Sequence, residues 1–298
     1  MKSAREADEL PGDTHVIAIS LDGANVRLNE PGPKRGRPDE RPDKQEDEEL
    51  EPTCFKNAMV GTVAYFGEIA EGKHSPGYLH QTCIGQMPED KFLTFKERFE
   101  EEVDHCLELC ATSSRPIDRL LLLDGGTNLH GYLDKNPDLK YLPRLIDFFH
   151  ATEHLGKATE ALFGKKSKAG RKWAETYRHI LKTDVDGVTK LRRSLAYYEQ
   201  KQKLSKQRQK DLATEITFFR RGGKYMTYAD FRARGWPIGS GVVEAACKSI
   251  VKQRLCRSGM RWSREGGQPI MTIRTLVCSG RWQQAWAAAE QIQHPEAA

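Results

Sequence analysis

The sequence predicts an α/β protein with a strand-rich first half and a basic, mainly helical second half. In the first half, short apolar runs rich in β-branched residues alternate with a segment whose apolar residues recur at helical spacing. Strands that alternate with helices in this way are typical of α/β domains. The 298 residues suffice for one large domain with an insertion, or for two smaller domains.

Three strands, a helix and a fourth strand are expected in chain order. VIAISLDGANVRL at 16–28 is the first strand, and the apolar runs that begin at Ala58 and Gly77 are the next two. Apolar residues at helical spacing predict a helix over 91–110. RLLLLDGG at 119–126 is typical of a buried strand that ends in a turn, because a pair of glycines closes its apolar run.

Helices are expected to dominate the remainder of the chain. RLIDFFHATEHL at 144–155 starts like a buried strand and continues as a helix. Residues 157–235 are expected to be helical and basic, either as an insertion or as a separate lobe. The amphipathic segment 239–255 predicts a strong helix, and two further helices are expected near 264–278 and 280–291.

Positive charge gathers in the C-terminal half. Residues 157–235 carry 21 Lys and Arg against eight Asp and Glu, and residues 236–298 carry eight against four. Residues 30–51, by contrast, carry nine acidic and five basic side chains. A basic surface of this extent attracts a polyanion such as DNA, although solvated helices can have the same composition. DNA is therefore the expected partner.

Three features favour a cytoplasmic protein. No apolar run is long enough to span a bilayer, so no membrane association is expected. The N-terminus MKSAREADEL is too polar for a signal peptide. The seven cysteines are odd in number, contain no CxxC pair and are expected to be reduced thiols, with Cys106 and Cys110 as buried side chains.

Three acidic residues carry the chemical hypothesis. Asp22 and Asp124 are each expected at or near the end of an apolar strand, where a scaffold holds functional groups rigidly. Glu244 lies in the first turns of a helix for which Ser240 is the expected N-cap. Each acid alone has an ordinary explanation, as a turn residue or as an acid favoured by the helix dipole. Together they suit two Mg²⁺ or Mn²⁺ ions about 3.5–4 Å apart, which assist displacement at phosphorus.

Basic residues follow Glu244 on the same predicted helix. Lys248 and Lys252 are expected on the face of Glu244, where they could bind phosphate, although an ordinary surface helix has the same Glu–Lys pattern. Three arginines extend this expected DNA-binding surface: Arg254, Arg257 and Arg261.

Four blocks of the chain resemble a known family in the right order. GWPIGSGVVEAACKSIVKQRLCRSGMRWS at 235–263 resembles the glutamate-bearing block of bacterial insertion-sequence transposases of the ISKra type. These transposases belong to the DDE superfamily and are distant relatives of Mutator-like elements. ISLDGANVRL at 19–28 and LLLLDGG at 120–126 are similar to the family's two aspartate blocks. RLIDFFHATEHLG at 144–156 is similar to the segment that carries a Cys-or-Asp-x-x-His signature.

The resemblance implies a ribonuclease-H-like fold, with a mixed five-stranded sheet and a basic helical insertion before the last acidic helix. Residues 1–156 would form the first part of the core, with a mobile charged loop at 30–53. Residues 157–235 would form the insertion, and 236–298 would complete the catalytic core.

The resemblance also implies an activity: hydrolysis at transposon ends, then attack of the freed 3′-OH on target DNA. Asp22, Asp124 and Glu244 would be the catalytic metal ligands for two Mg²⁺ or Mn²⁺ ions. His150 would lie near the site, in contact with the scissile phosphate, and Asp147 would orient it; a core histidine with a satisfied partner is the alternative. A homodimer in the bacterial cytoplasm, associated with the nucleoid, is expected.

Family members usually begin with a longer region that contains a helix-turn-helix-like module, which reads transposon ends. Here the first expected strand starts within about twenty residues of Met1. A shortened copy, a split reading frame or a relic is therefore expected, with a separate N-terminal DNA-binding protein or a full-length transposase as a further partner. The alternative function is an inactive, truncated transposase that only binds DNA.

Other motifs predict different functions or roles. HATEH at 150–154 matches the H-x-x-E-H pattern of zinc metallopeptidases, for which Glu160 or Glu175 would be the third ligand. KRGRP at 34–38 resembles the core of an AT-hook, although acidic residues follow it and favour a flexible loop. Three tryptophans could stack on bases but are expected in the core: Trp262, Trp282 and Trp286.

Overall fold

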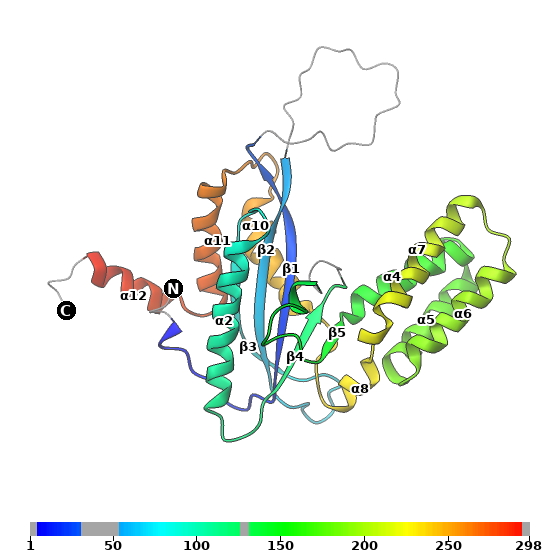
Figure 1. Cartoon of the computed structure of the whole chain (residues 1–298), viewed down its shortest axis with the longest axis horizontal. Coiled ribbons are helices and arrows are strands. Elements are labelled where there is room, and N and C mark those ends of the chain that lie inside the picture. The colour runs from blue at the N-terminus through cyan, green and yellow to red at the C-terminus, as the bar shows by residue number, and fades with distance from the viewer. Residues whose placement is uncertain (1–4, 31–53, 126–130, 294–298) are drawn as a thin grey trace, which may run out of the picture.

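The computed structural model describes residues 5–30, 54–125 and 131–293. Its centre is a mixed five-stranded sheet with helices on both faces (Figure 1). The strands are β1 (Val16–Leu28), β2 (Cys54–Phe66), β3 (Tyr78–Gln86), β4 (Asp118–Leu123) and β5 (Arg144–Ile146). The structure confirms the α/β class, the expected strands and the mixed character of the sheet.

The strands lie in the order β3-β2-β1-β4-β5. β1 pairs antiparallel with β2 over its whole length, and β2 pairs antiparallel with β3. β4 pairs parallel with the first part of β1, and β5 pairs parallel with β4. β1 is therefore the central strand, and its two neighbours run in opposite directions.

One face of the sheet packs against helix α2 (Leu93–Ala111). Side chains alternate between the faces of a strand, so Ile17, Ile19 and Leu21 all point to this side, where they meet Phe95 and Phe99 of α2. Cys106 and Cys110 of the same helix are also buried there, as expected.

Two groups of helices share the opposite face. Helix α4 (Phe148–Phe163) packs with Val16 and Ala18 at the start of β1. Near the end of β1, Ala24 and Val26 pack against α9 (Gly241–Ala246) and the π-helix η2 (Cys247–Lys252). The short α10 (Gln253–Leu255) follows η2, and α11 (Arg264–Cys278) packs beside η2 and over β3. Residue 22 of β1 thus lies between two separately covered regions.

A helical lobe extends from the side of the sheet at which β5 lies (Figure 1). Its elements are α4, α5 (Lys168–Thr183), α6 (Gly187–Lys201), α7 (Lys206–Gly222), the 3-10 helix η1 (Gly223–Tyr225) and α8 (Tyr228–Ala233). Trp173, Leu195 and Phe219 belong to its apolar core. Residues 157–235 are helical as expected, but α4 begins at Phe148, so one helix joins the sheet to the lobe.

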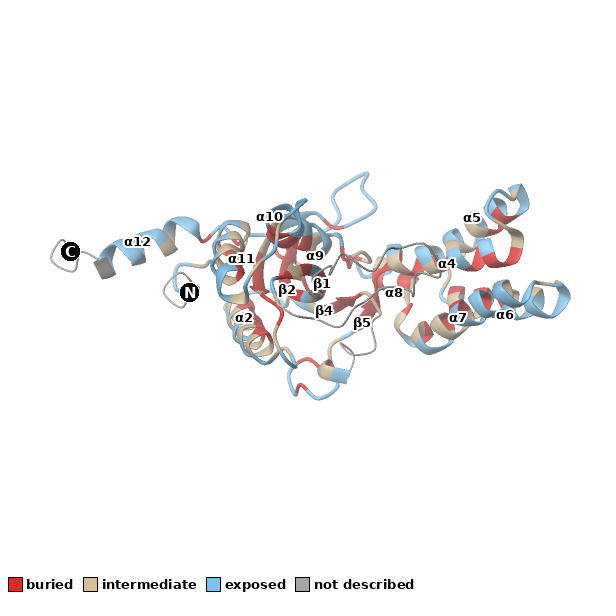
Figure 2. Cartoon of the chain, turned by 90° about the horizontal axis from the view of Figure 1, so that it is seen from above, coloured by how far each residue is buried: buried red, intermediate tan, exposed pale blue. Residues whose placement is uncertain are grey.

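Helix α12 (Trp282–Gln293) lies at the end of the molecule opposite the lobe (Figure 2). The expectation that its tryptophans are core residues was wrong. Trp282 is 36% exposed and Trp286 is 53% exposed, because α12 extends away from the body of the protein. Trp262 is partly buried against the cluster beneath η2.

Two general expectations can also be compared with the structure. No described helix combines the length and the apolar character that a membrane crossing requires. The cysteines whose side chains are described are all free thiols. The AT-hook-like segment 34–38 lies outside the described residues.

Candidate active site

The register of the sheet brings Asp22 and Asp124 together. The parallel pairing of β1 with β4 ends at Leu21 opposite Leu123. The next residue after each of these two leucines is an aspartate. Because side chains alternate between the two faces of a strand, both aspartates point to the same face of the sheet as Ala18. The pairing stops one residue before each aspartate, so the two carboxylates project from the point at which β1 and β4 cease to pair.

Asp22 lies in the middle of β1, and not at or near the end of the strand as expected. β1 continues to Leu28 because β2 pairs with it along its whole length. Only the pairing with β4 stops before Asp22. The Gly23 amide donates a hydrogen bond of 2.6 Å to Asp22 Oδ1. A side chain at position 23 would be crowded, since a Cβ there would lie 2.2 Å from Asn57 Nδ2.

Glu244 reaches the same region from helix α9. Val243 and Ala246 are buried against the sheet, whereas Glu244 is exposed. Ser240 immediately precedes the helix, as expected of an N-cap, but its side chain does not cap the backbone. Instead, the Ser240 hydroxyl donates to Glu244 Oε1 at 3.3 Å. This contact directs the glutamate toward the N-terminal end of its own helix.

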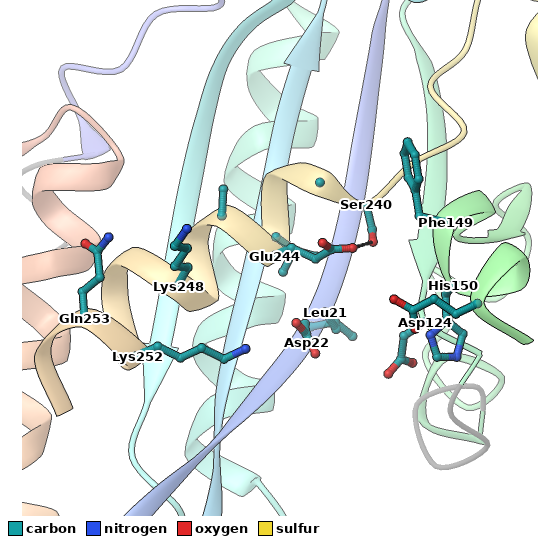
Figure 3. Close-up of a pocket in the computed structure, with 14 residues that line it drawn as sticks. Leu21, Asp22, Asp124, Phe149, His150, Ser240, Glu244, Lys248, Lys252 and Gln253 are labelled. Atoms are coloured by element: carbon teal, nitrogen blue, oxygen red, sulfur yellow. Dashed lines mark hydrogen bonds between the residues drawn. The ribbon is translucent and has the colours of Figure 1, made fainter. Parts of the chain in front are cut away.

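Asp22, Asp124 and Glu244 line one cavity of about 950 Å³ (Figure 3). Lys248 and Lys252 line it too. The two lysines, Asp22 and Glu244 lie on one side of the cavity, near η2 and β1, whereas Asp124 lies on the other side. The remaining three residues of the expected DNA-binding surface do not line the cavity: Arg254, Arg257 and Arg261.

The π-helix η2 forms part of this wall and was not predicted. It runs from Cys247 to Lys252, directly after the turn that carries Glu244. π-Helical turns are rare and are frequent at functional sites. Burial raises the pKa of the Cys247 thiol well above its usual value, and the neighbouring Asp22 carboxylate raises it further. Cys247 therefore stays protonated and can donate its hydrogen to Asp22.

Asp147 connects the two helices that border the cavity. It is fully buried and is the N-cap residue of α4, where its carboxylate accepts from the His150 amide at 2.6 Å. The same carboxylate also accepts a hydrogen bond from the Ser240 amide. Asp147 thus fixes the backbone at His150 and at the start of α9. Its hydrogen bonds go to these amides and not to the imidazole ring.

His150 lines the cavity and takes part in a second set of contacts. Its Nε2 lies 3.2 Å from Nε2 of His154, and Nδ1 of His154 lies 2.6 Å from Glu215 Oε2. The HATEH motif contained a signal for the histidine pair, because residues four apart share a helix face. No local pattern related Glu215 to them, since it belongs to α7.

The chemistry of the three carboxylates fits a hard divalent cation, which prefers oxygen ligands and accepts the remainder from water or phosphate. Within the described ranges, however, no three His, Cys, Asp or Glu side chains are grouped as a ligand set for one metal ion. The same finding applies to the hypothesis of a zinc site at HATEH. Among the described residues, neither Glu160 nor Glu175 completes a site with the two histidines. The two histidines are instead hydrogen-bonded to each other.

Comparisons of this chain with protein-family models, with curated proteins and with solved structures found no match. The resemblance to ISKra-type transposases therefore remains a prediction. The geometry of the cavity is the basis on which a function can be argued.

Proposed function

We propose that this chain is the catalytic part of a DDE-type DNA transposase with a ribonuclease-H-like core. One observation carries the proposal: the pairing of β1 with β4 ends one residue before Asp22 and Asp124, and both aspartates line one cavity with Glu244. These residues are far apart in the sequence. A mixed five-stranded sheet with a helical lobe inserted before the Glu244 helix also agrees with the architecture that the resemblance implies.

Asp22, Asp124 and Glu244 would hold the divalent ions. When bound, a pair of Mg²⁺ or Mn²⁺ ions would activate the attacking oxygen and stabilise the leaving oxygen of a phosphodiester. The protein's own contribution is to hold the three acids on rigid elements and to border the cavity with positive charge. Lys248 and Lys252 suit contacts with DNA phosphates, because both are exposed and line the cavity.

The helical lobe supports DNA as the substrate. Many of its Lys and Arg side chains are exposed, such as Arg171, Lys190 and Lys210. A surface of this kind holds the DNA backbone without reading its sequence. A further DNA-binding partner that recognises transposon ends is therefore part of the proposal. A transposase acts on paired ends, so a homodimer is part of the proposal.

The decisive experiment measures metal-dependent nicking of duplex DNA by the Asp124→Asn variant. Because the neutral amide lacks the negative charge with which the carboxylate attracts a divalent cation, we expect nicking to fall roughly 100-fold or more. The melting temperature should hardly change, since Asp124 is partly exposed. Asp104→Asn is the matched control, because Asp104 is an exposed residue of α2 on the other side of the sheet.

Retained nicking by Asp124→Asn would contradict the assignment. If the wild-type chain binds DNA in a salt-sensitive way but never nicks it with Mg²⁺ or Mn²⁺, the alternative function is correct, and the chain is a DNA-binding relic.

A further inference from the structure

The contacts of His150 extend from the cavity into the helical lobe. His150 and His154 occupy successive turns of α4, and Glu215 lies on α7, which packs along α4. The hydrogen bonds run from His150 to His154 and from His154 to Glu215. A residue of the lobe is thus connected to a wall of the proposed active site.

Glu215 is an expensive residue to bury. Its side chain is only 7% exposed, and its hydrogen-bond partner among the described residues is His154. Burial of a carboxylate is costly unless hydrogen bonds or opposite charges compensate for it. Phe218 stacks on the His154 ring with centroids 3.6 Å apart and planes 12° apart. The His154 ring is therefore held by a stack on one face and by hydrogen bonds at both nitrogens.

The hydrogen bonds determine where the ring protons lie. An ionised Glu215 can only accept, so Nδ1 of His154 must carry the hydrogen. When the His154 ring is neutral, it has one donor and one acceptor, which leaves its Nε2 as an acceptor. Since one hydrogen lies between the two Nε2 atoms, it must belong to His150. Neutral His150 is then the Nε2–H tautomer, and its Nδ1 is an acceptor.

We propose that Glu215 and His154 are positioning residues that fix His150 as its Nε2–H tautomer. Nδ1 of His150 has no hydrogen-bond partner among the described residues, and His150 lines the cavity. An Nδ1 acceptor binds the O–H group of a water molecule or of a DNA 3′-OH. It cannot donate to a phosphate oxygen. The consequence for catalysis rests on the proposed function: His150 would orient the attacking hydroxyl instead of contacting the scissile phosphate.

The tautomers can be measured directly by NMR on the whole chain with ¹⁵N-labelled histidine. The measurement is made at a pH at which the ¹⁵N shifts show that both rings are neutral. We expect His150 to have its proton on Nε2 and His154 to have its proton on Nδ1. A His150 ring with its proton on Nδ1, or an even mixture of tautomers, would overturn the proposal.

Glu215→Gln tests whether the carboxylate sets these tautomers. The amide can either donate to or accept from Nδ1 of His154, so both tautomers become available to the pair. We expect a mixture of His150 tautomers and a fall in kcat for nicking of roughly 10- to 100-fold, with little change in KM for DNA. Asp211→Asn is the matched control, since Asp211 is exposed one turn earlier on α7.

The two proposals fail in different ways. If Glu215→Gln leaves the His150 tautomer unchanged, the positioning role is wrong, whatever the nicking rate. If the wild-type chain does not nick DNA, the proposed function fails, but the tautomers still decide this inference. Should Glu215→Gln fold poorly, the double variant His154→Phe/Glu215→Gln keeps an aromatic ring on Phe218 without a buried charge. In that variant the ratio of the His150 tautomers must shift from the wild-type ratio to that of a free histidine, or the proposal is overturned.

Discussion

Two buried glutamates show how the sheet core differs from the helical lobe. In the core, Glu102 of α2 is 1% exposed and is bound by Arg5 and Arg281. In the lobe, Glu215 is bound by His154. A guanidinium keeps its charge at every accessible pH, whereas the charge and the tautomer of a histidine can change.

The difference separates a structural role from a functional one. The two arginines always balance the negative charge of Glu102. Through Glu102 they also join the N-terminal segment and the start of α12 to α2. Glu215 is bound by His154, which is also hydrogen-bonded to His150, so the charge of Glu215 can affect His150. A buried carboxylate is therefore no sign of function by itself; what matters is whether its partner touches the cavity.

The largest expected effect is on stability, and it tests the structural role of the arginines around Glu102. Arg281→Met leaves the buried Glu102 carboxylate with one arginine and should lower the free energy of unfolding by roughly 3–5 kcal/mol. Denaturant unfolding measures the loss. Arg115→Met is the control, because Arg115 forms an exposed pair with Asp13 whose loss should cost about 0–1 kcal/mol. Equal losses in the two variants would contradict a central structural role for Arg281.

The same pair predicts how stability depends on pH. Burial raises the pKa of Glu102, but the hydrogen bonds and charge of Arg281, together with Arg5, outweigh it, and the pKa lies below its ordinary value of 4.5. A carboxyl with a lowered pKa stabilises the folded state above the pKa of the unfolded chain. This stabilisation is lost as the pH falls through the folded pKa.

We therefore expect the unfolding free energy of the wild-type chain to fall as the pH drops below about 4.5, the ordinary glutamate pKa. In Arg281→Met the fall over this range should be smaller, because Glu102 has lost most of what lowers its pKa. Denaturant titrations at several pH values measure both slopes. A variant with the same pH dependence as the wild-type chain would show that other carboxylates dominate acid unfolding.

The two regions also differ in how far the sequence predicts them. The strands were predicted because alternation and apolar runs are local signals, and Asp22 and Asp124 were candidates because each follows such a run. Their position at one cavity depends on a register between distant strands, which no local pattern specifies. Glu215 could not be predicted as part of the site, since its role depends on the packing of α7 along α4.

The helix that carries Glu244 shows the same limit at a finer scale. Its amphipathic pattern predicted a helix over 239–255, and the structure has helical turns from Gly241 to Leu255. The π-helical part was not predicted, because the residue pattern does not distinguish a wider turn from a regular one. The tryptophans of α12 show the opposite error: apolar character predicted burial, but both side chains are exposed.

The smallest effect concerns the basic wall of the cavity. Lys248→Glu combined with Lys252→Glu should weaken binding to duplex DNA about 10-fold and reduce the slope of log affinity against log salt by roughly one to two. The reason is that fewer counterions are released when fewer phosphates are neutralised. The Glu215→Gln variant should bind DNA as the wild-type chain does, because Glu215 is buried in the lobe.

This pair of measurements separates contact with DNA from the positioning of His150. Lys73→Glu is the control for each of the two single substitutions, since Lys73 is exposed between β2 and β3 and does not line the cavity. A comparable loss of affinity in Lys73→Glu would mean that DNA senses only the net charge of the protein. Unchanged binding in the double lysine variant would remove Lys248 and Lys252 from the contact surface, and the DNA would then have to approach the acids along the helical lobe.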